Sequence, residues 1–551
     1  MKTRNTFLFK TLFKTLLMLC YFAVLLSCGN SANKKSAHKK EQVIAASLGA
    51  EPSILDAAKA SDRYSFVVLD YINENLTNIE TADDATLTVL PGIAETWEHN
   101  SDYTEWVFHL RQALWSDGKK ITADHFVYSI KRIINKESAS PMAMYYDYIK
   151  NADAILKGEK DYTELGITAI DENTLKITTE YPIKNLDEFA AKIPPQRKDI
   201  VEKFPDSYGS DAEKIICSGA FKVKEWIHNS KIELIKNENF WNAKNVKLKS
   251  LTFKIIRGEN AAIGELLNGS IDIARAYTIS WIDKLKSQNR FTEISGVDSR
   301  VRYVFMNQKD KLFSNRKIRQ AVSASLNRDE ICKDLFDNIY KPAYGFVALS
   351  TKLDNQNYRS LAGEPIKKLL ENVGDPKAHF IKGMQELGLG TDPSQVTISI
   401  MFPSNESSKF DEYLQSSLTQ TLGVNVVLDK VESTVFKKRN RSLEYQIGFK
   451  SWAGGVENPS RYLDLFLPGN RIVPTGWEND EYTRLVLTAK KSADPAVQLE
   501  NYKRAEELLL VEDCCIAPYA NQTYNIFVQP NLKNVRQFYL GTYNLKYAYI
   551  E

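Results

Sequence analysis

Residues 94–129 read AETWEHNSDYTEWVFHLRQALWSDGKKITADHFVYS, and the order of local patterns in this stretch decides the fold class. Trp106, Phe108 and Leu110 alternate with the residues between them, which is the two-residue period of a strand with one face packed against a core. Residues 116–118 (SDG) predict a tight turn next, because glycine tolerates a positive φ and aspartate bonds its own backbone. We therefore expect a strand that ends in a defined turn.

A helix is expected directly after this turn. Thr122 is a suitable N-cap, and a carboxylate at Asp124 favours the positive end of the helix dipole. Phe126, Ile130 and Ile133 follow at helical spacing, so one face of the helix is expected to be buried. A strand, a turn and a helix in succession indicate an α/β fold, and no residue of the stretch points to catalysis.

The length and composition are those of a soluble protein with more than one domain. The chain has 551 residues, which is too long for one hydrophobic core and indicates two or three domains. With 43% apolar and 26% charged residues, its composition is that of an ordinary globular protein. Subtracting the 4 basic residues of a segment expected to be removed from the 72 in the chain leaves 68 against 69 acidic residues. This balanced charge offers no electrostatic case for binding nucleic acid.

The N-terminus has the pattern of a secretory signal. Residues 1–27 combine a basic start with an apolar run at 16–26 that is too short for a spanning helix; an uncleaved N-terminal anchor is the alternative. The sequence LLSC at 25–28 resembles a bacterial lipobox, which makes Cys28 the expected lipid-bearing N-terminus of the mature chain. Residues 28–41 are polar without an apolar period, so we expect a flexible tether.

No cluster of residues predicts a metal site or a catalytic site. The cysteines of the expected mature chain other than Cys28 are Cys217, Cys332, Cys514 and Cys515. The sequence leaves open whether they are buried thiols or disulfides, and none has zinc-ligand spacing. Phosphate-binding, dinucleotide-binding and hydrolase motifs are absent from the sequence. Acidic pairs such as 83–84 and 506–507 are interpreted as solvated faces. We therefore predict no enzyme, no cofactor and no metal.

The opening stretch is similar to the signature of the extracytoplasmic solute-binding proteins that serve oligopeptide ABC importers. That signature is Ala-x-x-Trp, Asp, Phe-x-Leu-Arg, Trp-Ser-Asp-Gly and Thr-Ala-Asp-x-Phe-Val-Tyr-Ser. The matching residues here are Ala94, Trp97, Asp102, Phe108, Leu110, Arg111, 115–118, 122–124 and 126–129. Further segments that resemble the family are 51–56 (EPSILD), 218–226 (SGAFKVKEW), 269–272 (GSID), 316–328 (RKIRQAVSASLNR) and 476–479 (GWEN). The resemblance thus covers nearly all of the expected mature chain.

The resemblance implies an α/β, type II periplasmic-binding fold, in which two lobes close around a cleft and a third domain is added. The implied parts are a signal peptide at 1–27, a lipid-anchored tether at 28–41, lobe I at 42–75 with 186–300 and 512–551, domain II at 76–185, and lobe III at 301–511. From the residue pattern, strands are expected at 43–48, 174–179, 231–236, 251–256, 396–401 and 424–429, and helices at 262–268, 317–326, 410–422 and 499–511.

The resemblance also implies where a ligand binds. Residues 450–459 (KSWAGGVENP) match a family stretch that lines the cleft and pairs with the peptide backbone as a neighbouring strand. The ligand-binding residues carried over from it are Ser451, Trp452, Ala453, Gly454 and Gly455. The family's aspartate, which holds the peptide's ammonium, falls on Gly455, and a basic residue that often precedes Gly-Trp falls on Phe449. Because a buried ammonium needs an anionic partner, we expect that Glu457 takes this role or that the ligand has no free amino terminus.

Other cleft positions come from the resemblance alone. Ser61, Asp62 and Arg63 match the segment whose backbone faces the peptide from the smaller side of the cleft. Tyr145 and Tyr303 match aromatic positions of the cleft, Tyr303 less closely. Packing in the core or on the surface is the alternative for both tyrosines, because tyrosine is common in each place. The same alternatives apply to the loop above, where the tryptophan can be a core residue and the two glycines a plain turn.

The leading interpretation is a lipid-anchored binding protein that captures oligopeptides and delivers them to an ABC importer, without catalysing a reaction. Its expected partners are the permease subunits with their cytoplasmic ATPases, and the membrane through Cys28. It is expected to be a monomer of the bacterial cell envelope, in the periplasm or on the outer face of the cytoplasmic membrane. The alternatives are the same fold with a modified peptide or non-peptide solute, a surface lipoprotein for adhesion or sensing, and an extracellular hydrolase.

Overall fold

A computed structural model describes residues 41–81, 87–404, 409–456, 458–470, 472–538 and 542–551. Gln42–Glu551 forms one compact unit. The predicted signal peptide, Cys28 and Glu457 lie outside the described residues. Within the described part of the chain, no helix combines the length and the apolar character that crossing a membrane requires.

The largest element of the fold is a mixed sheet to which the described residues contribute eleven strands. The strand order is β17-β16-β18-β12-β19-β11-β1-β10-β9-β8, and β13 pairs with β19 from outside this path. These strands are β1 (Val43–Leu48), β8 (Phe221–Ile227), β9 (Lys231–Lys236), β10 (Ser250–Ile255), β11 (Ile273–Ala276), β12 (Thr292–Met306), β13 (Lys341–Pro342), β16 (Thr397–Pro403), β17 (Asn425–Val431), β18 (Ile447–Ala453) and β19 (Ile516–Val528).

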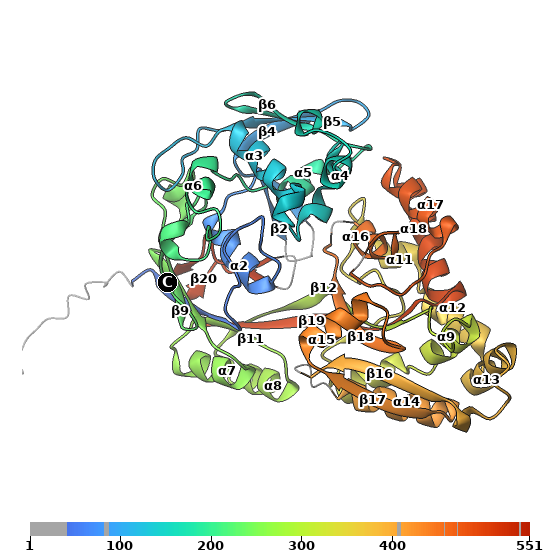
Figure 1. Cartoon of the computed structure of the whole chain (residues 1–551). Helices are drawn as coiled ribbons and strands as arrows, with labels where there is room; N and C mark the ends of the chain where they lie inside the picture. Colours follow the sequence, from blue (N-terminus) through green and yellow to red (C-terminus); the bar gives the residue numbers. More distant parts are fainter. Residues whose placement is uncertain (1–40, 82–86, 405–408, 457, 471, 539–541) are drawn as a thin grey trace, which may run out of the picture. The chain divides into compact units, whose positions relative to one another are not determined.

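Two long strands, β12 and β19, connect the two ends of this sheet, and Figure 1 shows them side by side between β11 and β18. They pair antiparallel, with 292–297 opposite 523–528 and 301–305 opposite 516–521. Between Val297 and Val301 the register shifts, so residues 298–300 form an irregularity of the bulge type. A bulge bends a strand and interrupts its ladder, which places a natural bending point in the middle of this connection.

Buried apolar side chains form three large clusters. The first cluster takes its residues from 44–72, 217–253 and 524–550, with Ile273. The second cluster contains Ala58 and residues from 76–193, and the third cluster contains residues from 301–520. β19 contributes to the third cluster at its start and to the first at its end. The division into three domains with the boundaries given above stays a prediction.

The stretch that decides the fold class lies in the second cluster. Its sheet has the order β4-β5-β7-β6 among the described strands, with β4 (Ala94–His99), β5 (Glu105–Leu110), β6 (Ile167–Asp171) and β7 (Thr174–Thr178). Gly118 has a φ of 87°, and Thr122 precedes α3 (Ala123–Ile133) in an extended conformation. Phe126, Ile130 and Ile133 are fully buried. The predicted strand, turn and helix are therefore confirmed.

The remaining helices and strands include all the other elements that the residue pattern predicted. The further helices are α2 (Arg63–Ile72), α4 (Ala152–Lys157), α5 (Leu186–Ala190), α6 (Lys198–Lys203), α7 (Glu259–Asn268), α8 (Ile279–Ser287), α9 (Arg316–Ala324), α10 (Arg328–Glu330), α11 (Tyr358–Ala362), α12 (Pro365–Val373), α13 (Pro376–Glu386), α14 (Phe410–Leu422), α15 (Ser433–Arg441), α16 (Ser460–Leu463), α17 (Asp480–Lys490) and α18 (Pro495–Glu507). Short described strand pairs are β2 (Thr77–Thr81) with β3 (Leu87–Pro91), β14 (Lys352–Leu353) with β15 (Gln356–Asn357), β20 (Leu532–Lys533) with β23 (Tyr549–Ile550), and β21 (Arg536–Phe538) with β22 (Thr542–Asn544). The strands and helices expected from the residue pattern are all present; the last expected helix is α18 continued by a π-helical turn.

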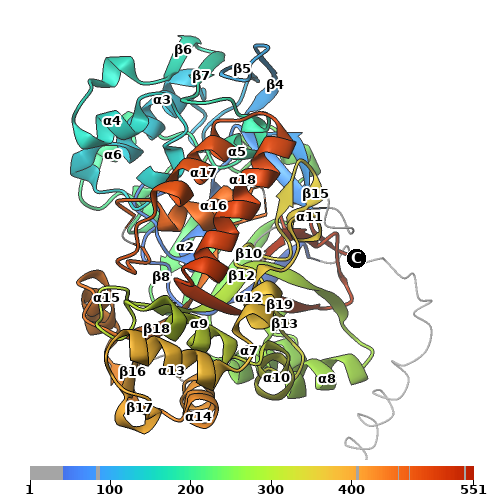
Figure 2. The same ribbon diagram turned by 90° about the vertical axis from the view of Figure 1, so that its right-hand side faces the viewer.

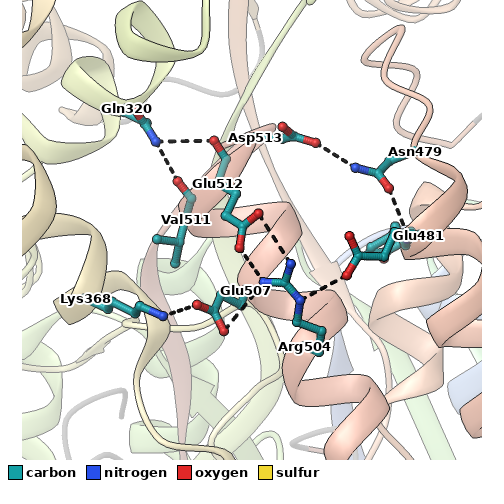
Figure 3. Close-up of polar contacts among 10 residues, drawn as sticks. Gln320, Lys368, Asn479, Glu481, Arg504, Glu507, Val511, Glu512 and Asp513 are labelled. Atoms are coloured by element: carbon teal, nitrogen blue, oxygen red, sulfur yellow. Dashed lines mark hydrogen bonds and ion pairs between the residues drawn. The ribbon is translucent and has the colours of Figure 1, made fainter.

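Polar contacts fix the turn from which β19 starts. Figure 2 shows α17 and α18 side by side, and Figure 3 shows the contacts at the end of α18. Arg504 pairs with three carboxylates there, those of Glu481, Glu507 and Glu512. Gln320 of α9 donates to the carbonyl oxygen of Val511 at 2.8 Å. The turn is thus tied to α9 and α17 before the chain enters β19.

The four described cysteines are buried free thiols, which answers the question that the sequence left open. Burial raises the pKa of the Cys217 and Cys332 thiols to about 12. Such thiols carry almost no thiolate near neutral pH, so they are expected to be chemically inert.

Candidate ligand-binding cleft

The edge of β18 is the feature of the cleft that can bind an extended chain. β18 pairs with β12 along its whole length, from Met306 opposite Ile447 to Arg300 opposite Ala453. On its other side, β16 pairs only with Ile447 and Gly448. Residues 449–453 therefore keep one edge to which no strand of the described chain is paired. Main-chain groups of such an edge can form a ladder with an added strand.

A cavity of about 990 Å³ lies beside this edge. Its walls include Phe449 and Ser451 of β18, one face of α15, Ser61 before α2, and Met144. These residues come from segments of all three clusters, so the cavity is a cleft between them rather than a pocket inside one. The volume is within the range of about 300–1,000 Å³ that ligand sites of proteins occupy.

The three residues of segment 61–63 have different surroundings. Ser61 is exposed and lines the large cavity. Asp62 is the N-cap of α2, where its carboxylate accepts from the backbone N–H groups of Tyr64 and Ser65 at 2.9 Å each. Burial raises the pKa of Asp62, but hydrogen bonds from Ser53 and Ser65 outweigh it and hold the pKa below its ordinary value. Arg63 lines a separate cavity of about 310 Å³.

The two predicted tyrosines differ in position. Tyr145 is half-buried, and the guanidinium of Arg461 lies 5.1 Å from the centroid of its ring. Tyr303 is 0% exposed and packs edge-to-face on Phe346 with the ring centroids 5.0 Å apart. The structure therefore does not bring Tyr303 to the cleft: its position in β12 directs the ring into the third cluster. Tyr303 is therefore a core residue, which was the alternative to a position in the cleft.

The loop after β18 turns into the third cluster. Trp452 is half-buried and donates from Nε1 to the carbonyl oxygen of Arg461 at 2.9 Å. Gly455 is buried with a φ of 92°, and its carbonyl oxygen accepts from the Tyr462 hydroxyl at 3.1 Å. A side chain at this φ is strained, so the backbone at position 455 favours glycine. Ala453 lies at the end of the edge, and Glu457 is not described.

We expect the substitution Gly454→Ala to lower the free energy of unfolding by about 1–3 kcal/mol, because it overpacks this loop. An added Cβ would lie 2.5 Å from the Tyr462 ring, which is fully buried and whose hydroxyl also donates to the Ser299 carbonyl oxygen at 2.5 Å. Urea unfolding measures the change. The matched control is Gly264→Ala in α7, where the new Cβ meets nothing within 4 Å and alanine favours the helix. Equal stability of the two variants would contradict the expectation.

Residues 88–472 match the family described as bacterial extracellular solute-binding proteins, family 5 middle. The chain belongs to this family. Among curated relatives of this solute-binding protein, the dipeptide-binding protein DppE of Bacillus subtilis is 28% identical over 539 residues, 95% of this chain and 96% of DppE. The periplasmic oligopeptide-binding protein OppA of Salmonella typhimurium is 28% identical over 450 residues, 78% of each chain.

Solved structures show the same fold. The crystal structure of Haemophilus influenzae OppA in complex with RPPGFSPFR superimposes with a TM-score of 0.80 at 24% identity, over 93% of this chain and 99% of that one. The solute-binding protein therefore has the type II periplasmic-binding fold, as the sequence implied.

A buried ion pair that the sequence did not reveal positions the segment before α2. The Asp56 carboxylate is fully buried and accepts from Arg132 Nη1 and Nη2 of α3, both at 2.6 Å. Gln196 donates to the same carboxylate at 3.2 Å. These contacts join the loop that carries Ser61 to the second cluster. In the sequence, Asp56 stood out only as part of the EPSILD segment that resembles the family. Its partners Arg132 and Gln196 lie far away in the sequence, so the ion pair could not be predicted.

A second ion pair joins the second cluster to the third. Lys490 of α17 is 9% exposed at its side chain and contacts Asp147 and Asp464, both at 2.9 Å. Burial raises the pKa of Asp464, against the attraction of Lys490. A cavity of about 490 Å³ lies next to these three residues. These contacts connect the second and the third cluster beside this smaller cavity.

We expect part of the stability of the solute-binding protein to depend on pH through His228. Its two ring nitrogens lie 2.9 Å from Glu51 and 3.3 Å from Asp211, and the hydrogen bond to Glu51 is the main cause that raises the pKa of His228. The stabilisation is therefore fully present below the unfolded pKa of about 6.5 and is lost as the pH rises through the folded pKa. Because the ring is half exposed, the effect is expected to stay below about 1 kcal/mol.

An NMR titration of the His228 ring measures its pKa directly. Urea unfolding of the protein and of His228→Gln on both sides of that pKa then measures the loss. A titration at or below about 6.5, or equal pH dependence in both proteins, would contradict the assignment.

Proposed function

We propose that this solute-binding protein captures oligopeptides in the cleft beside β18 and delivers them to the permease subunits of an ABC importer. The observation that carries the proposal is the edge of residues 449–453, which faces a cavity of about 990 Å³. Backbone pairing along this edge binds a peptide whatever its sequence, while the cavity receives side chains. The names of the relatives, which bind dipeptides and oligopeptides, support this ligand class.

The proposal assigns binding roles to few side chains. Ser61 and Ser451 line the cavity, and Ala453 is the last residue of the edge. Tyr145 stands beside Arg461 and is not among the described residues that line this cavity. The role of Glu457 as the partner of a peptide ammonium stays a proposal that the variant Glu457→Ala tests: it should weaken binding of free-amine peptides and leave N-acetylated peptides unaffected.

The proposal places the protein outside the cytoplasm, as a monomer attached to the membrane by lipid on Cys28. It involves no chemical step: the protein binds its ligand, closes on it and docks on the permease. The predicted signal peptide and the LLSC sequence support this location. The proposed domains are those given above, with β12 and β19 as the connection about which the lobes close.

We expect a peptide to lose at least tenfold in affinity when methyl groups replace the amide hydrogens that point toward β18. Each main-chain hydrogen bond contributes about 0.5–1.5 kcal/mol. The loss of two therefore costs about 1–3 kcal/mol, and a tenfold loss of affinity corresponds to about 1.4 kcal/mol. Calorimetric titration of one pentapeptide and two N-methylated analogues measures the effect. In an extended strand successive N–H groups point to opposite sides, so the analogue methylated at the intervening residues is the matched control. Equal affinity of both analogues would contradict backbone pairing.

A further inference from the structure

Two kinds of contact join the parts of the chain that surround the cleft. The first is the strand pair β12 and β19, which connects the two halves of the large sheet and has a bending point between Val297 and Val301. The second consists of side chains of α16 and α17, which reach from the third cluster to residues of the segment 76–193. A rotation about the bending point that separates the third cluster from the second has to break these side-chain contacts.

Lys490 of α17 makes one of these contacts. Its Nζ lies 2.9 Å from the carboxylate of Asp464, in the segment of the third cluster, and 2.9 Å from that of Asp147, in the segment of the second. Burial lowers the pKa of Lys490, but Asp464, Tyr181 and Asp147 outweigh it and hold the pKa well above its ordinary value. The ammonium therefore stays charged, and it keeps Asp464 as an anionic partner when Asp147 moves away.

Arg461 of α16 makes the other contact and is joined to β18. Its guanidinium lies 5.1 Å from the ring centroids of Tyr145 and of Phe189, both of which pack against the second cluster. Separations below about 6 Å give an attractive cation–π interaction. The carbonyl oxygen of Arg461 accepts from Trp452 Nε1 of β18 at 2.9 Å. This contact is thereby linked to the strand whose edge is proposed to bind the peptide.

The partners in the second cluster lie at the border of the cleft. The 3-10 helix η2 (Ala143–Tyr146) contains Tyr145, and Asp147 follows it directly. Met144 of the same helix lines the cavity of about 990 Å³, while Tyr146 is buried in the second cluster and fixes the helix there. One short element thus lies against the cavity and carries two of the groups that Lys490 and Arg461 contact.

Contacts of a different kind hold the second cluster to the first. The backbone N–H of Ser116 donates to the carbonyl oxygen of Cys217 at 2.8 Å, and the buried Asp56 carboxylate binds Arg132 at 2.6 Å. By contrast, the side chain of Asp147 is 39% exposed, so water can solvate this carboxylate when it leaves the ammonium of α17. A buried pair has no such replacement. We therefore expect the third cluster to move away from the other two.

We propose that Lys490 and Arg461 form a latch that holds the third cluster against the second after the lobes have closed, and that this latch slows the release of the ligand. The inference rests on the proposed function, in which the lobes close on a peptide. In the open form, Lys490 keeps Asp464 and Asp147 is solvated, while the Arg461 guanidinium leaves the two rings. Because the contacts form only after the lobes meet, they affect the rate of release and leave the rate of capture unchanged.

The test compares the protein with the variant Asp147→Asn, which removes the carboxylate of the second cluster and leaves Lys490 paired with Asp464. Stopped-flow mixing with a pentapeptide that carries a fluorophore on a lysine side chain measures association, and displacement by unlabelled peptide measures release. We expect release to be at least about threefold faster, as for a partly exposed ion pair, and association to stay within about twofold. Asp153→Asn is the matched control, because Asp153 pairs with Lys157 inside α4, and it should release the peptide like the unchanged protein.

Two further measurements separate a latch from a merely structural role. Phe189→Leu removes one ring beside Arg461 without touching the ion pair, and it should also speed release. Raising salt from about 50 mM to about 500 mM should speed release from the unchanged protein more than from Asp147→Asn, because salt screens the accessible ion pair. Unchanged release in both variants, or slower association alone, would overturn the latch and leave the proposed function intact. If the unchanged protein binds no peptide, the proposed function fails and the inference falls with it.

Discussion

Replacing Glu506 by alanine is expected to lower the free energy of unfolding by about 3–5 kcal/mol. Glu506 of α18 is 1% exposed and accepts from Arg359 Nη2 at 2.6 Å. Its carboxylate also accepts the backbone N–H groups of Phe346 at 2.7 Å and Val347 at 3.0 Å. Alanine would leave the buried guanidinium of Arg359 without its anionic partner. Chemical unfolding at equilibrium measures the difference.

The neighbouring residue is the control. Glu507 contacts Lys368 and Arg504, as Figure 3 shows. Its side chain is 22% exposed, so water screens these ion pairs, which are expected to contribute about 0–1 kcal/mol. Glu507→Ala should therefore be nearly neutral. If both variants lost the same stability, burial would not be what distinguishes the two glutamates.

Asp56→Ala is expected to lower the free energy of unfolding by about 3–5 kcal/mol, because Arg132 would stay buried without the carboxylate that it binds. The substitution should also weaken ligand binding, since the Asp56–Arg132 pair anchors the loop that carries Ser61 to α3. Chemical unfolding and titration with a peptide ligand measure the two effects.

The control for this prediction is an exposed carboxylate in the same part of the chain. Asp153 pairs with Lys157 one helical turn away, and both side chains are 58% exposed. Asp153→Ala should cost about 0.3–0.5 kcal/mol and leave binding unchanged. A variant Asp56→Ala that unfolded like Asp153→Ala would show that the buried pair does not hold this loop.

The elements that the sequence predicted correctly depend on short-range patterns. In residues 94–129, the strand period, the SDG turn and the helical spacing after Thr122 each involve neighbours within a few positions, and all three are confirmed. The helix at 410–422 has the expected bounds for the same reason. The fold followed from a resemblance that extends over nearly the whole chain, and the family match confirms it.

Contacts between distant residues could not be predicted in this way. Glu506 was interpreted as half of a solvated acidic pair, yet it is buried, because its partner Arg359 lies 147 positions away. The resemblance placed Tyr303 in the cleft, whereas the side-chain alternation of β12 turns it into the core beside Phe346. Residues of α15 line the cavity, and the sequence analysis predicted neither this helix nor its position.

Identification of the ligand by mass spectrometry, after the purified protein is denatured, tests the central claim most directly. Binding through the main-chain edge of residues 449–453 does not depend on a single peptide sequence, so the account predicts a mixture of short peptides of varied sequence. A single non-peptide species bound at one molecule per chain would contradict it.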